Sequence, residues 1–465
     1  MKGARTPRTA HVRGRRYDVA VIGGGLAGLA ASVSLVERGL RVALLEARPE
    51  LGGRCYSYTD EATGDVVENG QHILLGAYHS TLRYLDMIGT GDLLTVKTRL
   101  VLPFHHPEKH FASFSVGHLP SPLHITSGLL RFSLLSFRER QSLLAVGRAL
   151  VGWDRKTESE LSNLTVLEWL RKLRQSDEAV RCLWSPIAVS VMNETAERSS
   201  ALLFARSLRL AFLGTKRDSS ILIPSVGQTE LYVRGAEKLL EESGAEILRG
   251  TEAAAIEMEG PAAAGVRLRS GRVVSSDRVI SCVPHYALSR LLPGALRRSE
   301  PFSHLGAFGS VPIVSIHLWF DGDFMETEYL GLISRRVQWV FNRRRILKER
   351  GGPEGYLSAV ISGAREFVDM TKSQLVSIAL EDITGTFPGS RKVKLVHSVV
   401  IKEKRATYSP GNDVERLRPR PVTPVGNLFL AGDWTDTGLP PTIEGAVASG
   451  FRAAGLAAGA SSGTA

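Results

Sequence analysis

The sequence predicts an α/β fold whose main parallel sheet is assembled from both ends of the chain. Three observations support this prediction. Residues 17–22 form a short β-rich apolar run that leads directly into glycines and a helix-like stretch. Residues 427–433 form a second apolar run, which is followed by a segment of small residues typical of a final helix. Because 465 residues exceed one typical domain, a second structural unit is expected between these two ends.

The first apolar run opens a pattern typical of a Rossmann-type βαβ unit. After the strand and its glycines, residues 27–38 are predicted to form a helix and residues 41–45 a second strand. Gly23 permits the tight turn, and Gly25 lets the backbone approach a pyrophosphate. Gly28 allows the helix to pack closely on the strand, with its N-terminus facing the phosphates. The segment therefore predicts a dinucleotide site.

An acidic residue follows the second strand at the expected distance from the glycines. Glu46 lies roughly twenty residues further on, where a carboxylate can accept hydrogen bonds from ribose hydroxyls. This carboxylate disfavours a 2′-phosphate, although the neighbouring Arg48 weakens that exclusion. Strand, glycines, helix, strand and acid thus occur in the order that dinucleotide binding requires.

A second glycine motif identifies the expected dinucleotide. Leu51-Gly52-Gly53-Arg54 lies just past Glu46. It resembles the second fingerprint of the amine oxidase and phytoene desaturase superfamily of flavoproteins, in which the glycine pair and the arginine approach the pyrophosphate. The resemblance implies FAD rather than NAD. Some amine oxidases carry a C-terminal cysteine for a covalent flavin link, but no cysteine follows Cys282 here, which favours non-covalent FAD.

The C-terminal run agrees with this resemblance. It ends in Gly432-Asp433, and residues 438–446 begin the final helix. In flavoproteins that resemble this chain, the aspartate binds the ribityl-phosphate side and the helix N-terminus faces the isoalloxazine ring. A helix N-terminus favours electron-rich groups through its free N–H groups and its dipole.

Two further segments are placed beside the cofactor by resemblance. Residues 246–256 and 266–274 are predicted to form a strand pair, followed by a strand at 279–282, and the first of these implies a backbone contact to adenine near Ala253. Residues 69–72 are expected beside the flavin ring. The predicted cofactor-binding residues are Gly23, Gly25, Leu26, Ala27, Gly28, Glu46, Ala47, Arg48, Gly52, Gly53, Arg54, Gly70, Gln71, His72, Ala253, Gly432, Asp433, Pro441, Thr442 and Ile443.

The FAD-binding domain is expected to be discontinuous, with an inserted mixed α+β substrate domain and an amine-oxidase-like arrangement. Residues 86–219 look largely helical, whereas 301–419 contain β-like runs such as 311–320 and 392–402. The predicted parts are a basic disordered tail (1–16), the FAD-binding domain (17–85, 220–300 and 420–456), the substrate domain (86–219 and 301–419) and a flexible tail (457–465).

Charge and cysteine content narrow the function classes. The net charge of +11 partly reflects the basic residues among the first sixteen. It would suit nucleic acid or an anionic membrane, but no zinc spacing or RNA-binding signature accompanies it, and no nucleic-acid partner is expected. The cysteines Cys55, Cys182 and Cys282 lie far apart, which fits a reducing, cytoplasmic compartment.

Peripheral membrane contact is expected through residues 125–153. No apolar run in the sequence reaches the roughly 18 residues that a bilayer span requires. Residues 125–153 interleave leucines, Phe132 and Trp153 with arginines, and such an apolar face with basic flanks can lie on an anionic bilayer. The alternative is an amphipathic core helix of the substrate domain.

The substrate is suggested by a closer resemblance. Residues 68–76, 119–123 and 191–195 look like the squalene-associated FAD-dependent desaturases of hopanoid biosynthesis, whose members are described as hydroxysqualene dehydroxylases. The resemblance covers residues 17–451. It implies a long hydrophobic isoprenoid substrate, reductive dehydroxylation of hydroxysqualene to squalene by hydride from reduced flavin, and partnership with prenyl-condensing enzymes.

His72 is the candidate catalytic residue, as an acid or as a group that orients the departing hydroxyl. An acid at that oxygen typically accelerates such a step by about 10²–10⁴-fold. The alternative is that His72 only hydrogen-bonds backbone near the cofactor. The histidine-rich stretch at His105, His106, His110 and His118 lacks zinc spacing and acidic partners, so we expect surface or core histidines and no metal site.

Three other functions use the same motifs. The first is a carotenoid or phytoene-type desaturase, which reverses the redox direction. The second is a flavin amine oxidase, and the third is a non-catalytic prenyl-binding escort protein. The intact phosphate-binding glycines with Glu46 and Asp433 disfavour the escort protein, and a purified protein with a flavin spectrum would exclude it.

Overall fold

The computed structural model describes residues 16–117, 119–348 and 351–459. Of the predicted basic tail, only Arg16 lies within the described residues, where its guanidinium pairs with Asp277 at 2.6 Å. The predicted flexible tail begins too early. Helix α16 (Ile443–Gly459) continues through residues 457–459 because Ala457 and Ala458 favour a helix and Ala457 is buried against the core. Residues 460–465 of that predicted tail lie outside the described residues.

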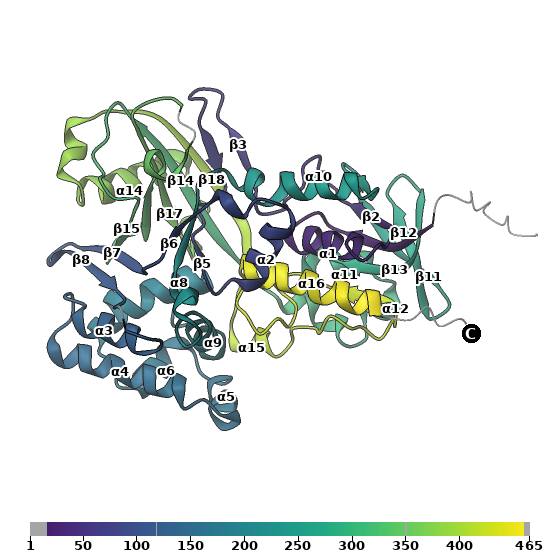
Figure 1. Ribbon diagram of the computed structural model, residues 1–465, viewed down its shortest axis with the longest axis horizontal. Helices are drawn as coiled ribbons and strands as arrows, with labels where there is room; N and C mark the ends of the chain where they lie inside the picture. The colour runs from purple at the N-terminus through teal and green to yellow at the C-terminus, as the bar shows by residue number, and fades with distance from the viewer. Residues whose placement is uncertain (1–15, 118, 349–350, 460–465) are drawn as a thin grey trace, which may run out of the picture.

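The first large sheet combines the two ends of the chain with a central segment, as the sequence predicts (Figure 1). Five of its strands run parallel, and a three-stranded antiparallel part is attached through β13. The strands in order are β10 (Glu246–Leu248), β2 (Val42–Leu45), β1 (Tyr17–Ile22), β13 (Val273–Ser281), β12 (Ala262–Leu268) and β11 (Ala253–Glu259), with β19 (Leu428–Leu430) also paired to β13.

The strand boundaries differ from the prediction in the central segment. The expected strand 246–256 is two strands that pair in different directions, because the chain turns at Gly250, whose φ is +60°. The expected strand 266–274 spans a turn at Gly271, whose φ is +88°, and residues 279–282 largely belong to β13. Both glycines adopt a left-handed conformation that interrupts a strand, and alternation of residue types does not reveal it.

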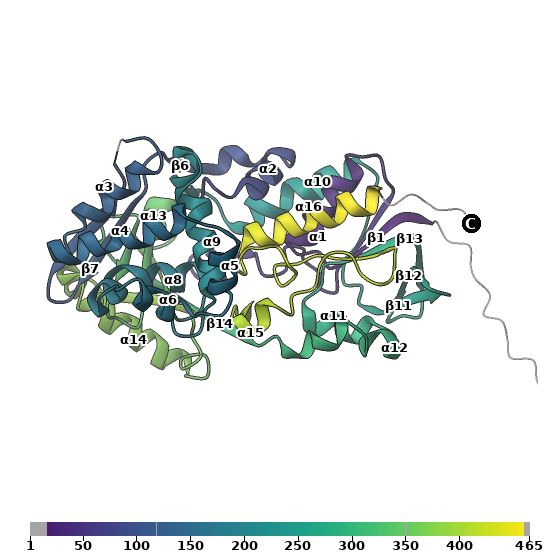
Figure 2. The ribbon, with the colours of Figure 1, turned by 90° about the horizontal axis from the view of Figure 1, so that it is seen from below.

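Helix α1 (Leu26–Val36) and α16 lie side by side in both ribbon views (Figures 1 and 2). Ten of the eleven residues of α1 are buried, so this helix is covered on nearly all sides. The two helices approach closely at Gly450, where an added Cβ would overlap the carbonyl oxygen of Ala27. The final helix therefore packs on the helix that follows the first glycine motif.

The second large sheet lies at the opposite end of the molecule (Figure 1). The β-like runs predicted at 311–320 and 392–402 are its two longest strands, β14 and β18. In order, its strands are β18 (Leu395–Tyr408), β14 (Ser310–Phe320), β17 (Gly355–Ile361), β16 (Trp339–Asn342), β15 (Tyr329–Leu332), β7 (Val101–His106) and β8 (His110–Ser115).

Residues 86–219 are largely helical but also contribute strands β6, β7 and β8. The two small sheets pair β3 (Ser57–Thr59) with β4 (Val66–Glu68), and β9 (Ile221–Pro224) with β5 (Leu74–Leu75) and β6 (Leu94–Lys97). The remaining α-helices are α2 (His79–Met87), α3 (Leu123–Arg131), α4 (Phe137–Val151), α5 (Arg155–Leu161), α6 (Val166–Lys172), α7 (Asp177–Ala179), α8 (Ser185–Met192), α9 (Ala201–Phe212), α10 (Gly235–Glu242), α11 (His285–Leu291), α12 (Gly294–Arg297), α13 (Arg343–Ile346), α14 (Lys372–Thr384) and α15 (Asn412–Glu415).

The apolar residues expected to face a membrane in 125–153 are mostly core residues. This stretch folds as α3 and α4, separated by a break at which Ser136 and Glu139 form a capping box. The core-helix alternative therefore describes most of this apolar face. The buried apolar residues are Leu129, Phe132, Leu134, Leu135, Leu143, Val146 and Leu150. Among the described residues, no helix combines the length and apolar character needed to span a bilayer.

Candidate functional site

The two glycine motifs of the N-terminal region meet in space. The amide of Gly52 donates to the carbonyl oxygen of Gly24 at 2.8 Å, and Gly25 forms a bridge with Gly52. An added Cβ on Gly53 would lie 3.0 Å from the Cα of Gly25. Two backbone segments without side chains thus run next to each other at the end of β1, as a site that receives a pyrophosphate requires.

Glu46 lies beside this pair of glycine segments. One carboxylate oxygen accepts from the amide of Gly24 at 2.7 Å, and the other accepts from the amide of Arg48 at 2.8 Å. Each oxygen keeps a further lone pair, so the carboxylate can also accept from a ribose hydroxyl. The amide of Thr251 donates to the carbonyl oxygen of Glu46 at 2.8 Å, which brings the start of β11 and Ala253 toward the same region.

The second glycine motif also reaches the C-terminal motif. Arg54 donates to the carboxylate of Asp433 at 2.7 Å and to the carbonyl oxygen of Ala406 at 2.7 Å. The Asp433 side chain is buried. Residues separated by 379 positions in the sequence therefore form one ion pair, and the three motifs share one site.

Two helix N-termini open at this site. In α1 the first regular helical hydrogen bond runs from the amide of Leu29 to the carbonyl oxygen of Gly25 at 2.9 Å. In α16 the corresponding bond runs from the amide of Ala446 to Thr442 at 3.0 Å. The amides that precede these bonds, including those of residues 26–28, have no carbonyl partner within their own helix. The amide of Gly445 donates to the Thr442 hydroxyl at 3.2 Å. The other amides can receive phosphate or the polar edge of a ring.

Residues 69–72 supply buried polar atoms that need a partner. The carbonyl oxygen of Asn69 accepts from the Ser315 hydroxyl at 2.9 Å, and that of Gly70 accepts from the Gln228 side-chain amide. Buried polar atoms are nearly always hydrogen-bonded, so a cluster without partners indicates a ligand or ordered water. Within the described chain, the atoms of this cluster that have no partner are Asn69 Oδ1, Gln71 Oε1, His72 Nδ1 and Gln228 Oε1. The segment expected beside the flavin ring therefore fits such a polar group.

His72 is held as a neutral imidazole. Burial lowers the pKa of His72 to about 4, because the charged form loses its hydration. At neutral pH the ring therefore carries one N–H donor and one acceptor nitrogen. This state suits orientation of a hydroxyl better than donation of a proton as an acid.

A buried ion pair beneath this segment was missed by sequence reasoning. Arg343 donates to the Glu68 carboxylate at 2.9 Å, and both side chains are 1% exposed. Glu68 also accepts from the amide of Gln228 at 3.1 Å, and its carbonyl oxygen contacts His317 Nε2 at 2.8 Å. Arg343 begins a run of three arginines, which is typical of an exposed segment. No pattern in the neighbouring sequence indicates that Arg343 is buried.

One residue of the histidine-rich stretch lies in a cluster of possible metal ligands. Ligand atoms of His106, Glu178 and Cys182 lie within 4.8 Å of one another. Glu178 already pairs with Lys109 at 2.5 Å and with Arg181, so its charge is neutralised by cations of the protein, and the expectation of no metal site stays a prediction. Of the four histidines, His105 and His106 are buried, His110 is exposed and His118 lies outside the described residues.

Comparison with known proteins supports a flavin site. The family profile described as Flavin containing amine oxidoreductase matches residues 26–458. A hydroxysqualene dehydroxylase of Rhodopseudomonas palustris is 30% identical over 455 residues, which cover 94% of this chain and 97% of that protein. A zeta-carotene desaturase of Zea mays is 26% identical over 504 residues, which cover 98% of this chain and 85% of that protein.

Solved structures agree at the level of the fold. The cyclohexylamine oxidase of Brevibacterium oxydans superposes with a TM-score of 0.69 at 18% identity, covering 96% of this chain and 99% of that one. At that identity the likeness shows the fold alone. It confirms the predicted α/β, amine-oxidase-like fold class.

Proposed function

The chain belongs to the flavin containing amine oxidoreductase family and is a flavin-dependent oxidoreductase, and from this premise we propose that it binds FAD non-covalently and reduces hydroxysqualene to squalene. The FAD proposal is carried by the convergence of residues 23–28, 52–54 and 432–433 on one site. The adenine contact at Ala253 and the division into FAD-binding and substrate domains are part of this proposal.

The reaction exchanges a C–O bond for a C–H bond. The flavin, when reduced, supplies the hydride. The hydroxyl of the substrate leaves and takes up one proton to become water, so the substrate is reduced by two electrons. The chain's own contribution is to orient that hydroxyl through His72 and to exclude water from a cationic carbon. The 30% identity to a hydroxysqualene dehydroxylase supports this substrate, and prenyl-condensing enzymes are the expected suppliers.

An anaerobic turnover assay tests the proposed function. Purified protein with its flavin chemically reduced is mixed with hydroxysqualene in detergent, and the extract is examined by mass spectrometry. We expect squalene to appear together with reoxidation of the flavin. A flavin that stays reduced, with no squalene formed, would rule out this activity under the assay conditions.

A carotenoid desaturase is the second candidate, because the maize zeta-carotene desaturase matches over nearly the whole chain. This reaction runs in the opposite direction and removes hydride from a polyene precursor. The same preparation with oxidised flavin, incubated with phytoene, would then reduce its flavin and lengthen the conjugated system. Amine oxidation is tested alongside by flavin reduction with a diamine.

His72 is predicted to act as a neutral, hydroxyl-orienting group. The wild-type rate of flavin reoxidation by hydroxysqualene should be flat from about pH 5.5 to 8 and fall as the pH drops through about 4, where His72 becomes protonated. If His72 were the acid, the rate would instead fall as the pH rises above about 4. His72→Ala should slow the reaction about 10²-fold with flavin retained, because a misplaced reacting group costs about that much. Full activity with bound flavin would remove His72 from the mechanism.

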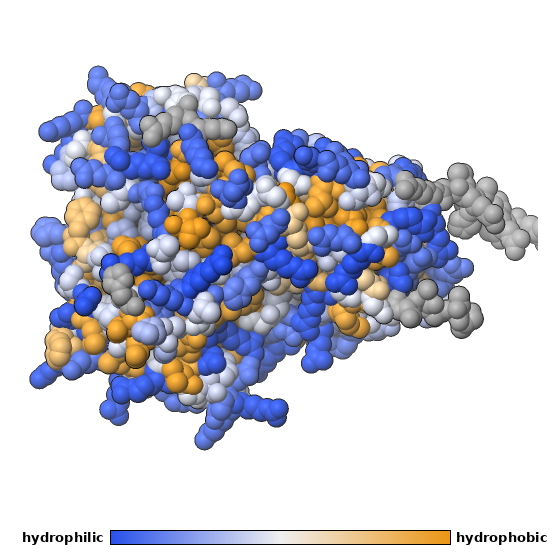
Figure 3. All heavy atoms as spheres, in the orientation of Figure 1, coloured by the Kyte–Doolittle hydropathy of each residue, from blue (hydrophilic) through white to orange (hydrophobic). Residues whose placement is uncertain are grey.

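Peripheral membrane contact stays a proposal and now rests on exposed apolar residues of α3 and α4. Leu123 and Phe137, at the N-terminal ends of α3 and α4, are 55% and 64% exposed, and Leu130 is 36% exposed. Arg131 and Arg138 are their basic neighbours in sequence. Figure 3 shows apolar surface interspersed with charged side chains over the part of the molecule that carries α3 and α4. An anionic bilayer suits this combination.

Aspartate at these positions should weaken membrane binding. The double variant Leu123→Asp, Phe137→Asp is expected to bind vesicles containing phosphatidylserine at least about tenfold more weakly, because burial of either side chain contributes about 1.5–3 kcal/mol. Vesicle co-sedimentation measures this. Val422→Asp, at a residue that is 52% exposed but lies outside α3 and α4, serves as the matched control. Equal binding of wild type and double variant would contradict the proposed surface.

A further inference from the structure

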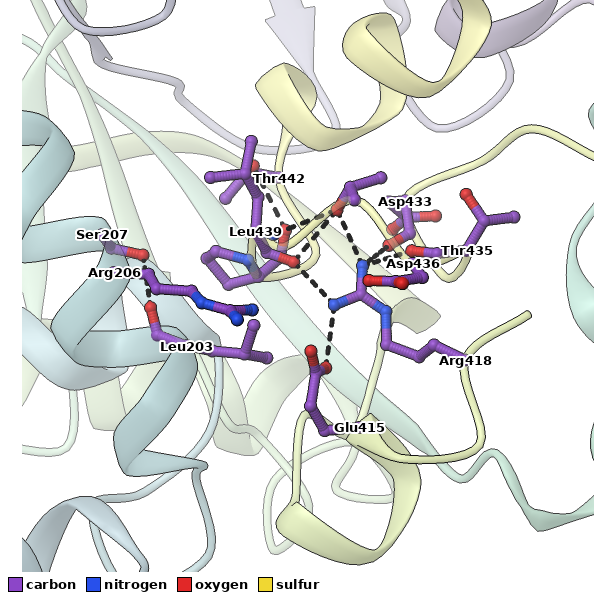
Figure 4. A network of polar contacts seen from close by, with 12 residues as sticks. Leu203, Arg206, Ser207, Glu415, Arg418, Asp433, Thr435, Asp436, Leu439 and Thr442 are labelled. Atoms are coloured by element: carbon purple, nitrogen blue, oxygen red, sulfur yellow. Dashed lines mark hydrogen bonds and ion pairs between the residues drawn. The ribbon is translucent and has the colours of Figure 1, made fainter. Parts of the chain in front are cut away.

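Arg418 lies against the loop of residues 433–442, which joins the Gly-Asp motif to the start of α16 (Figure 4). Its guanidinium donates to three backbone carbonyl oxygens of this loop. The acceptors are those of Asp433 at 3.1 Å, Thr435, and Leu439 at 3.0 Å. One side chain therefore contacts the loop near its beginning and near its end.

The charge of Arg418 is compensated inside the protein. Glu415 accepts from the guanidinium at 2.8 Å, and the ring of Tyr408 lies 5.3 Å from its central carbon. The hydroxyl of Thr437, also in the loop, accepts at 2.7 Å. Arg418 is only 6% exposed. A buried, paired and multiply bonded guanidinium is rigid, so it can fix the backbone that it contacts.

Some other hydrogen bonds of the loop join residues close in sequence, such as that from the amide of Thr435 to Gly432 at 3.0 Å. Others reach outside the loop, including those from the amide of Asp436 to Pro419 at 2.8 Å and from Trp434 Nε1 to Val283 at 3.1 Å. Each of these involves a single residue of the loop, whereas Arg418 contacts four.

The loop contains no strand or helix, and its Pro440 and Pro441 cannot donate backbone hydrogen bonds. Carbonyls that point to the same side need a donor with several N–H groups in a fixed plane. Arginine provides that fork, whereas the single ammonium of lysine cannot serve all the acceptors at once.

We propose that Arg418 is a positioning residue for the cofactor, which acts by fixing this loop. The loop carries Asp433 at one end and Thr442 at the other, and both are proposed flavin contacts. Arg418 holds the carbonyl oxygen of Asp433 while Arg54 holds its carboxylate at 2.7 Å. The part that concerns the flavin rests on the proposed function, whereas the ordering of the loop does not.

Two variants of the full-length protein test this role, Arg418→Lys and Arg418→Met. Hydrogen–deuterium exchange of the flavin-free protein should be about 10- to 100-fold faster in peptides covering 433–442 and unchanged in peptides covering β1 and α1. The FAD dissociation constant, from fluorescence titration, should rise about 10- to 100-fold in both variants, since each lost charged hydrogen bond corresponds to roughly one to two decades. Lysine keeps the charge but should not restore the loop.

Arg365→Met is the matched control. Arg365 also donates to a backbone carbonyl, that of Ser310 at 3.0 Å, and pairs with the buried Glu194, but it contacts no residue of the loop in the described structure. We expect lower thermal stability with unchanged FAD affinity.

The two levels of the proposal fail in different ways. Wild-type loop exchange together with wild-type FAD affinity in both Arg418 variants would overturn the positioning role. The same conclusion follows if Arg365→Met weakens FAD binding as much as the Arg418 variants do. If the wild-type protein takes up no FAD, the proposed function fails and the cofactor role falls with it, whereas faster exchange of 433–442 alone would still show that Arg418 orders the loop.

Discussion

Arg343→Met is expected to lower the free energy of unfolding by about 3–5 kcal/mol, because it leaves a buried carboxylate without its cation. The Arg343 guanidinium lies 2.9 Å from the Glu68 carboxylate, and neither side chain has appreciable contact with water. Methionine retains much of the length and apolar volume of the arginine stem, so the loss is mainly electrostatic. Urea unfolding of the flavin-free protein, followed by circular dichroism, measures the change.

The destabilisation should depend on pH. Burial already raises the pKa of Glu68 in the wild type, and Arg343 opposes that rise. Without Arg343 the pKa of Glu68 rises further, so its ionised form penalises the folded state. The penalty is complete above the folded-state pKa, shrinks as the pH falls through it, and vanishes below the unfolded-state pKa. The variant should therefore be closest to wild type near pH 5 and weakest near pH 8.

Glu68→Gln is the matched control for this pH dependence. It leaves Arg343 charged in the interior, and arginine does not lose its proton in proteins, so this variant lacks the penalty that grows with pH in Arg343→Met, and its destabilisation should not increase from pH 5 to 8. The double variant should be less destabilised than the sum of the two single variants. An Arg343→Met protein as stable as wild type, or equally destabilised at both pH values, would contradict the buried-pair interpretation.

The parts of the site that sequence analysis predicted are those encoded by local pattern. Strand, glycine turn and helix follow one another within residues 17–36, and short-range geometry determines them. The meeting of Arg54 with Asp433 is not local, and only resemblance to a family connected these two motifs before the structure did. Periodicity alone would have left the C-terminal motif as an unassigned strand and helix.

Other features could not be predicted because they depend on what covers a side chain. The apolar residues of α3 and α4 have the spacing of an amphipathic helix, and that pattern is the same whether a bilayer or a protein core covers it. Arginine usually lies on the surface of a protein, but packing encloses Arg343 and Arg418 and gives them buried partners. Burial of an arginine becomes visible only once distant segments are brought together.

Gly25→Ala is expected to abolish most FAD binding while leaving the fold intact. Gly25 has an ordinary φ of −72°, which alanine adopts without strain. The nearest protein atom to an added Cβ is the Cα of Gly53 at 3.9 Å, an ordinary contact. The chain itself therefore has no need for glycine at this position, and a strict requirement for glycine must come from a bound ligand.

The expected loss is about 100-fold or more in FAD affinity, because the added methyl group would hold the pyrophosphate away from the amides at the start of α1. Thermal unfolding of the flavin-free variant should match the wild type, and fluorescence titration with FAD measures the affinity.

The variant Gly28→Ala distinguishes a glycine that packing requires from a glycine that a ligand requires. A Cβ at Gly28 would overlap the carbonyl oxygen of Gly23, so this variant should lose stability even without ligand. If Gly25→Ala binds FAD as the wild type does, no pyrophosphate approaches that backbone. If Gly25→Ala instead unfolds as Gly28→Ala does, the glycine serves packing alone. Loss of FAD with an unchanged unfolding midpoint is the one result that assigns the space beside Gly25 to the cofactor.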